Sequence, residues 1–168
     1  YVNIPYSASL APTSAVACRI DLSLEDWADP TVMIPMSKFQ NGGYGFGINA
    51  THTSTDLPNS GYIGFYVRIG SSYRAAGFNI TNFEPNSKHS FVGTFDGRYI
   101  KLYVDGELKS VNDLGSSGNK ITYSNNNSLF FGCDVGTGSS PDSTSPYYFK
   151  GNILLSAVWN RVLTEQEV

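Results

Sequence analysis

Acidic residues two positions apart are the first arrangement in this sequence that could do chemistry. Glycoside hydrolysis uses two carboxyl groups, one on each side of the bond that breaks, and both must face one cleft. Asp105 and Glu107 flank Gly106 in a predicted turn. Glu165 and Glu167 stand in a predicted helical turn at the end of the chain. Neither pair is expected to lie side by side on a strand, so the sequence predicts a turn and a helix start rather than a catalytic pair.

The histidines and cysteines form no recognisable metal or nucleophile pattern. His52 and His89 are far apart, and neither stands near a cysteine or a carboxylate at metal-ligand spacing. The Gly-x-Ser-x-Gly signature of many serine hydrolases is absent from the sequence. Cys18 and Cys133 alternate in phase with the apolar residues of their strands, which predicts two buried free thiols. A disulfide between adjacent strands is the alternative.

Tyrosines in predicted loops are the clearest sign of a ligand site. Tyr44 lies in a glycine-rich segment, Tyr73 stands directly before Arg74, and Tyr147 and Tyr148 follow a long loop of small polar residues. Sugars present apolar C–H faces ringed by hydroxyl groups, so their sites pair a flat aromatic ring with charged, amide or backbone groups. These five residues are therefore predicted to bind ligand. The alternative for each tyrosine is packing at a strand end, and the sequence alone does not show which loops meet.

Composition places these residues on one folded domain. The chain has 168 residues, of which 40% are hydrophobic, 14% aromatic and 15% charged, and its net charge is −3. The lysines and arginines are scattered, which makes nucleic acid a poor candidate partner. No apolar stretch reaches the roughly 20 residues of a membrane-spanning helix, so membrane insertion is not expected. Two cysteines are too few for a disulfide scaffold.

Short runs in which apolar and polar residues alternate, separated by turn residues, predict an antiparallel sandwich. The clearest segment contains the pairs Asp96-Gly97 and Asp105-Gly106, which suit two-residue type I′ turns with positive φ at both positions. It predicts a meander with strands over residues 90–95, 98–105 and 107–111. Helical structure is expected only at the C-terminus, where Thr164 and Glu167 fit a capping box.

A series of motifs covers nearly the whole chain in order. The two most specific are the block from His89 to Gly106 and the closing series from Phe149-Lys-Gly-Asn-Ile153 to Trp159-Asn-Arg-Val-Leu-Thr164. The weaker ones are Tyr1-Val-Asn-Ile-Pro5, Gly43-Tyr-Gly-Phe-Gly-Ile48 and Leu129-Phe-Phe-Gly132. In this series the chain resembles the laminin-G-like and pentraxin-like branch of the concanavalin A-like lectin/glucanase superfamily. The resemblance implies a jelly-roll sandwich of two antiparallel sheets, one of them concave, with the termini close together.

The same resemblance raises the question of calcium. Similar pentraxin-like domains bind Ca²⁺ with acidic and amide side chains directly after the glycine that matches Gly132. This chain keeps one acid there, Asp134, where the pentraxins have a cluster. The resemblance therefore implies at most a single Ca²⁺, held by Asp134 with backbone carbonyls and with Asp142 or an asparagine. The alternative is that Asp134 is an ordinary solvated loop residue.

Together these features predict a single laminin-G-like jelly-roll domain over residues 1–168, excised from a larger extracellular, cell-surface or virion-surface protein. The favoured function is a non-catalytic recognition module that binds carbohydrate. Its expected partners are a glycan or glycoprotein surface and the neighbouring domains of the parent chain. A structural or protein-interaction domain without sugar binding is the alternative, and a glycoside hydrolase is third. The sequence leaves the glycan, the source and the oligomeric state open.

Overall fold

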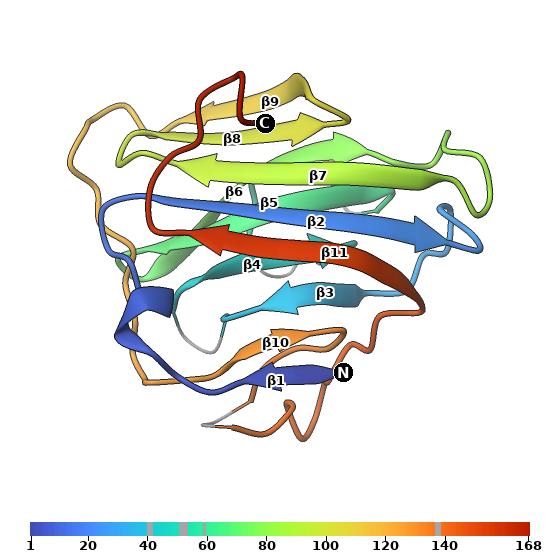
Figure 1. Ribbon diagram of the computed structural model, residues 1–168, viewed down its shortest axis with the longest axis horizontal. Helices are drawn as coiled ribbons and strands as arrows, with labels where there is room; N and C mark the ends of the chain where they lie inside the picture. The colour runs from blue at the N-terminus through green and yellow to red at the C-terminus, as the bar shows by residue number, and fades with distance from the viewer. Residues whose placement is uncertain (40–41, 51–53, 59, 137–138) are drawn as a thin grey trace.

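Two antiparallel sheets stacked face to face make up the fold, as the computed structural model shows for residues 1–39, 42–50, 54–58, 60–136 and 139–168 (Figure 1). His52 lies outside these described residues. The six-stranded sheet has the order β1 (Val2–Ile4), β10 (Leu129–Phe131), β3 (Met33–Ser37), β4 (Tyr44–Ile48), β5 (Tyr62–Ile69), β6 (Ser72–Asn79). The five-stranded sheet has the order β11 (Gly151–Trp159), β2 (Val16–Leu24), β7 (Lys88–Phe95), β8 (Tyr99–Val104), β9 (Glu107–Asp113). The predicted all-β sandwich is confirmed.

The inner faces of the two sheets pack against each other and form the main core. Cys18 and Ile20 of β2 are fully buried in it, whereas Arg19 and Asp21 alternate with them and form an ion pair outside it. In β8 the three apolar residues that share one face are buried as well: Ile100, Leu102 and Val104. Cys18 and Cys133 are both buried free thiols, as predicted. Burial raises the pKa of Cys18 well above its usual value.

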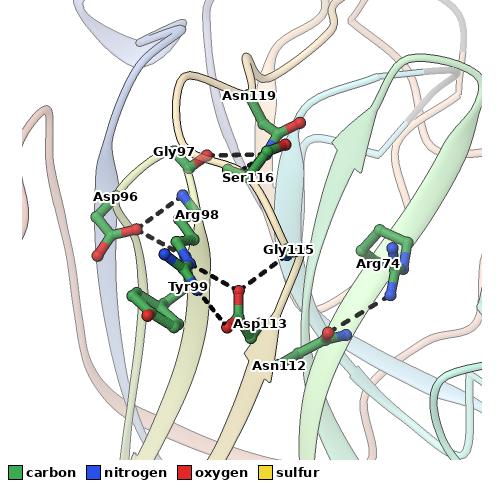
Figure 2. Close-up of polar contacts among 10 residues, drawn as sticks. All are labelled: Arg74, Asp96, Gly97, Arg98, Tyr99, Asn112, Asp113, Gly115, Ser116 and Asn119. Carbon is green, nitrogen blue, oxygen red and sulfur yellow. Dashed lines mark hydrogen bonds and ion pairs between the residues drawn. The ribbon is translucent and has the colours of Figure 1, made fainter.

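The three-stranded meander is formed as predicted by β7, β8 and β9. Its second turn, Asp105-Gly106, has φ of 52° and 83°, which are the positive angles of a type I′ turn. The first turn differs from the prediction, because Asp96 donates its N–H to the Tyr99 carbonyl and the turn is centred on Gly97 and Arg98. Only Gly97 has positive φ there, as in a type II′ turn. The Asp96 carboxylate accepts from the N–H groups of Arg98 and Tyr99 at 2.8 and 2.7 Å, which stabilises this alternative (Figure 2).

The C-terminal residues form a single hydrogen-bonded turn, so the predicted helical turn is wrong. The Glu167 N–H donates to the Thr164 carbonyl at 3.0 Å, and the Glu167 carboxylate accepts from the Thr164 N–H at 2.9 Å. The carboxylate makes its half of the capping box without a helix. The helix in the described residues is instead a 3₁₀ turn at Ala8–Leu10, capped by Ser7. Among those residues, no helix is long and apolar enough to cross a membrane.

The two ends of the chain lie on opposite sides of the sandwich in Figure 1, so the expectation that they are close together is wrong. The first strand, β1, is at one edge of the six-stranded sheet. The C-terminal segment crosses the outer face of the five-stranded sheet, where Leu163 packs against Ala17, Val92 and Tyr103. Burial of this leucine draws the end of the chain away from β1.

Gly93 of β7 is required where the two sheets approach each other. A Cβ atom at this position would lie 2.1 Å from a ring carbon of Phe65, which is fully buried. We expect Gly93→Ala to lower the free energy of unfolding by about 1–3 kcal/mol, because an overpacked core must shift. Urea denaturation measures this change. Val111→Ala, at a half-exposed position of β9, is the control, and an unchanged midpoint for Gly93→Ala would contradict the packing described.

Candidate functional site

A second apolar cluster lies on the outer face of the six-stranded sheet, and we call it the outer-face cluster. Its buried members are Ile34, Phe39, Ala50, Tyr66 and Ala75, and its partly buried members are Val32, Leu57, Tyr73 and Tyr147. Tyr66 points to this face because its neighbours Phe65 and Val67 point into the main core. Two of the tyrosines predicted to bind ligand, Tyr73 and Tyr147, therefore pack on one surface.

Tyr73 fastens a loop to this surface. Its hydroxyl donates to the Gly42 carbonyl and accepts from the Gly42 N–H, both at 3.0 Å. Its ring meets Phe39 edge to face, with the ring centroids 5.6 Å apart. Burial raises the pKa of Tyr73 to about 12. The hydroxyl is therefore engaged by the Gly42 backbone and by the Arg68 side chain, and the ring is the part that can contribute to a ligand surface.

Arg68 stands directly opposite Tyr73 in the ladder between β5 and β6, on the same face of the sheet. Its guanidinium carbon lies 5.3 Å from the centroid of the Tyr73 ring, and its Nε donates to the Gly70 carbonyl at 3.3 Å. Sequence analysis missed Arg68. The signal was available, because a hairpin that turns at Gly70 and Ser71 pairs Arg68 with Tyr73.

Arg68 also differs from the other arginines in its charge environment. The other four each pair with a carboxylate: Arg19 with Asp21, Arg74 with Asp56, Arg98 with Asp113, and Arg161 with Glu167. Within the residues that the structure describes, Arg68 forms no ion pair. The outer face of the six-stranded sheet therefore carries a guanidinium whose charge no described carboxylate neutralises.

The two predicted metal-binding residues are brought together at the base of one loop. The Asp142 N–H donates to the Asp134 carbonyl at 3.1 Å. The Asp134 carboxylate accepts from Ser37 Oγ and from the Val135 N–H, and burial together with the nearby Asp142 charge raises its pKa to about 6. Oδ1 of Asp142 accepts from the Ser145 N–H and from the hydroxyl and the N–H of Thr144, and these bonds lower the pKa of Asp142. Across the described residues, no three His, Cys, Asp or Glu side chains are grouped as metal ligands.

Tyr44 does not belong to the site, and the prediction that it faces a ligand is wrong. It is the first residue of β4, its side chain is fully buried in the main core, and its hydroxyl donates to the Leu10 carbonyl at 3.0 Å. The glycines beside it reflect close approach of strands rather than a loop. A Cβ atom at Gly45 would lie 2.3 Å from the Met36 carbonyl oxygen.

Arg74 is separated from Tyr73 because successive side chains of a strand point to opposite faces. Its Nε donates to Asp56 Oδ2 at 2.9 Å, and Asn112 of β9 donates to the same oxygen at 2.9 Å. Asn112 also donates to the Ala75 carbonyl at 2.8 Å, and Figure 2 shows Arg74 reaching Asn112. These bonds join β6 to β9. Arg74 is thus placed in a structural network rather than on the outer-face cluster.

Tyr147 and Tyr148 occupy different environments although they are adjacent. Tyr147 packs against the outer-face cluster, and its carbonyl accepts from the Ile34 N–H at 2.9 Å. Tyr147 has a φ of 43°, a conformation that non-glycine residues rarely adopt. Tyr148 is 53% exposed. One tyrosine therefore anchors the loop, and the other offers a ring to solvent.

Sequence analysis did not find the connected chain formed by Ser87, His89 and Asp105. Nε2 of His89 lies 2.8 Å from Ser87 Oγ, and Nδ1 lies 2.7 Å from Asp105 Oδ2, in the order of a serine–histidine–aspartate triad. Ser87 Oγ also contacts the Glu84 carbonyl at 2.6 Å, and a carbonyl can only accept. Ser87 donates its one proton to the Glu84 carbonyl, and Nδ1 of His89 donates to the Asp105 carboxylate, which can only accept. The Ser87 proton is not directed to the histidine, as activation of a nucleophile would require.

Comparison with known proteins shows which family and which solved structures share this architecture. A family model of laminin G type, described as the concanavalin A-like lectin/glucanases superfamily, matches residues 2–168. A search of curated proteins finds no match. The binding domain of botulinum neurotoxin serotype C1 is similar with a TM-score of 0.56 at 13% identity, over 92% of this chain and 35% of that chain. Domains LG4-5 of the mouse laminin alpha1 chain are similar with a TM-score of 0.56 at 13% identity, over 95% of this chain and 42% of that chain.

A third similar structure is the binding domain of botulinum neurotoxin DC in complex with SialylT. Its TM-score is 0.57 at 11% identity, over 96% of this chain and 35% of that chain. The chain thus spans less than half the length of each of these structures. Identities this low establish a shared fold. The family match over residues 2–168, together with the two stacked sheets, shows that the chain belongs to the laminin-G-like family of the concanavalin A-like lectin/glucanases superfamily.

Proposed function

We propose that this domain is a non-catalytic recognition module that binds glycans on the outer face of its six-stranded sheet. One observation carries the proposal: Tyr73 and Tyr147, predicted from separate segments, pack against the same outer-face cluster. Asp134 lies within electrostatic range of the Tyr73 hydroxyl. Aromatic rings beside hydrogen-bonding groups are the combination that sugar binding requires.

The exposed ring of Tyr148 is the stacking platform in this proposal, while Tyr147 holds the loop in place. Stacking on one ring contributes about 0.5–1.5 kcal/mol beyond the area that it buries. A single site of this kind binds weakly, with a Kd on the order of 0.1–1 mM. Weak sites become effective when several copies act together. This suits a domain of a larger extracellular, cell-surface or virion-surface protein whose partner is a glycan or glycoprotein surface.

Two similar structures support a glycan as the ligand class. One is the toxin binding domain in complex with SialylT. Another, with a TM-score of 0.56, is of botulinum neurotoxin type C, whose cell entry depends on interaction with two ganglioside molecules. Both belong to toxins that are longer than this chain. That this domain binds a similar ligand is therefore part of the proposal.

A protein-interaction role without sugar binding is the second candidate, and a groove between the sheet edges favours it. The groove has a volume of about 520 Å³ and lies between β1 and β11. Its exposed apolar residues are Tyr1, Val2, Ile4, Leu154 and Leu155. Contiguous apolar surface of this kind marks contact sites in soluble proteins. A glycan titration distinguishes the two candidates, because they use different surfaces.

We expect neutral and acidic oligosaccharides to shift NMR amide signals near the outer-face cluster at millimolar concentration. Tyr148→Ala should weaken the affinity about three- to tenfold, because it removes the exposed stacking ring without opening the core. Tyr99→Ala, on the five-stranded sheet, is the matched control and should leave the affinity unchanged. No shifts at about 10 mM glycan would favour the protein-interaction role, and shifts confined to the groove between β1 and β11 would contradict a glycan site on the outer face.

We expect no catalysis, and Ser87 provides a direct test. Because Ser87 donates its proton to Glu84, a fluorophosphonate probe should leave the intact mass of the protein unchanged, while a serine hydrolase in the same tube is labelled. Glu107→Gln should likewise leave glycan turnover at background, because Glu107 begins β9 and Asp105 lies in the turn before it. Labelling of Ser87 that disappears in His89→Gln would contradict the non-catalytic proposal.

Asp134 and Asp142 are the residues that we propose for a single Ca²⁺. The hydrogen bonds of both carboxylates within the described residues use Oδ1, so Oδ2 of each is the oxygen left for a cation. Calcium takes six to eight oxygens, so backbone carbonyls and water would complete the shell. Millimolar CaCl₂ should raise the melting temperature, since binding to the folded state stabilises it. Asp134→Ala should remove this rise and Glu165→Ala should keep it, whereas equal curves in calcium and in chelator would leave Asp134 without a metal role.

A further inference from the structure

Arg68 lies on the outer face, beside Tyr73, and its guanidinium can add a charge to the proposed glycan site. We propose that the glycan bound there carries an anionic group, a carboxylate or a sulfate, and that Arg68 is the residue that binds it. This inference rests on the proposed function and narrows its ligand class. It depends on two observations. Arg68 lies beside Tyr73, and its guanidinium forms no ion pair with a described carboxylate.

The guanidinium is held in place from two sides. Its Nε donates to the Gly70 carbonyl, and the Tyr73 ring lies against it at 5.3 Å. The backbone of Arg68 is fixed as well, because its N–H donates to Gly43 and its carbonyl accepts from Thr122, both at 2.9 Å. A side chain that is already ordered loses little conformational freedom on binding. The outer fork of two Nη groups is the geometry that carboxylates and sulfates accept in bidentate fashion.

Two other cations among the described residues, Lys38 and Arg74, do not offer an equal site on this face. Lys38 of the adjoining loop is 2% exposed, and its Nζ donates to the Asn127 carbonyl. Arg74 is committed to Asp56 on the other face of β6. Of these three cations, Arg68 is therefore the one that can bind an acidic group of the sugar.

The test compares ligands that differ only in the acidic group, 3′-sialyllactose against lactose and glucuronic acid against glucose, by NMR titration. We expect the acidic member of each pair to bind at least about tenfold more tightly, and this preference to fall as NaCl is raised. Arg68→Gln should abolish the preference, and Arg68→Lys should keep part of it, because lysine retains the charge without the fork. Arg98→Gln is the matched control, since Arg98 is exposed on the other sheet and paired with Asp113. Melting curves establish that each variant is folded.

The outcomes separate this inference from the proposed function. Equal affinity for acidic and neutral sugars, or an unchanged preference in Arg68→Gln, would overturn the role of Arg68 while glycan binding stands. Inorganic sulfate is a further arm, and sulfate that binds as tightly as the acidic sugars would show an anion site that does not recognise glycans, which overturns the inference. Absence of binding by every sugar would overturn the proposed function and this inference together.

Discussion

The direction in which Phe65 points is the constraint on which the rest of the structure depends. Its ring occupies the space that Gly93 leaves in the opposite sheet, so Phe65 can only point inward. Because side chains alternate along a strand, Tyr66 and Arg68 of β5 must then point outward. A register shift of one residue would bury the Arg68 charge in the apolar core, which costs several kcal/mol. The outer face and its guanidinium are therefore consequences of packing between the sheets.

Both faces of the six-stranded sheet are covered, and polar contacts to the backbone hold the covering loops. The Tyr73 hydroxyl satisfies both polar groups of Gly42, and the Tyr147 carbonyl accepts from Ile34. Buried polar groups need such partners, because an unpaired one costs about 1–3 kcal/mol. The Tyr73 hydroxyl thus holds a loop, and ligand recognition falls to the tyrosine rings and to neighbouring charged groups.

The residues that resemble a catalytic triad have a structural role, which is to hold the β8–β9 hairpin in place. Oδ1 of Asp105 accepts from the Ser90 N–H at 2.9 Å, and Oδ2 bonds the His89 ring at 2.7 Å. The same ring stacks on Phe83, with the centroids 3.6 Å apart. Asp105 sits at positive φ in the tight turn, so these contacts bind the β8–β9 hairpin to the start of β7. In this protein, an arrangement that resembles a catalytic triad stabilises the fold.

Local periodicity determined the strands of the meander, the inward set of β2 and the sandwich class, because the face of a residue on a strand depends only on its neighbours. It did not determine turn details, since the Asp96 carboxylate competes for backbone N–H groups and moves the first turn by one residue. Nor did it show that Tyr44 is buried, because glycines that admit a neighbouring strand look like a loop in sequence. Only the tertiary structure decided that Tyr73 and Tyr147 share a surface and that Arg68 lacks a carboxylate among the described residues. Such properties depend on contacts between residues far apart in the chain, which no local pattern contains.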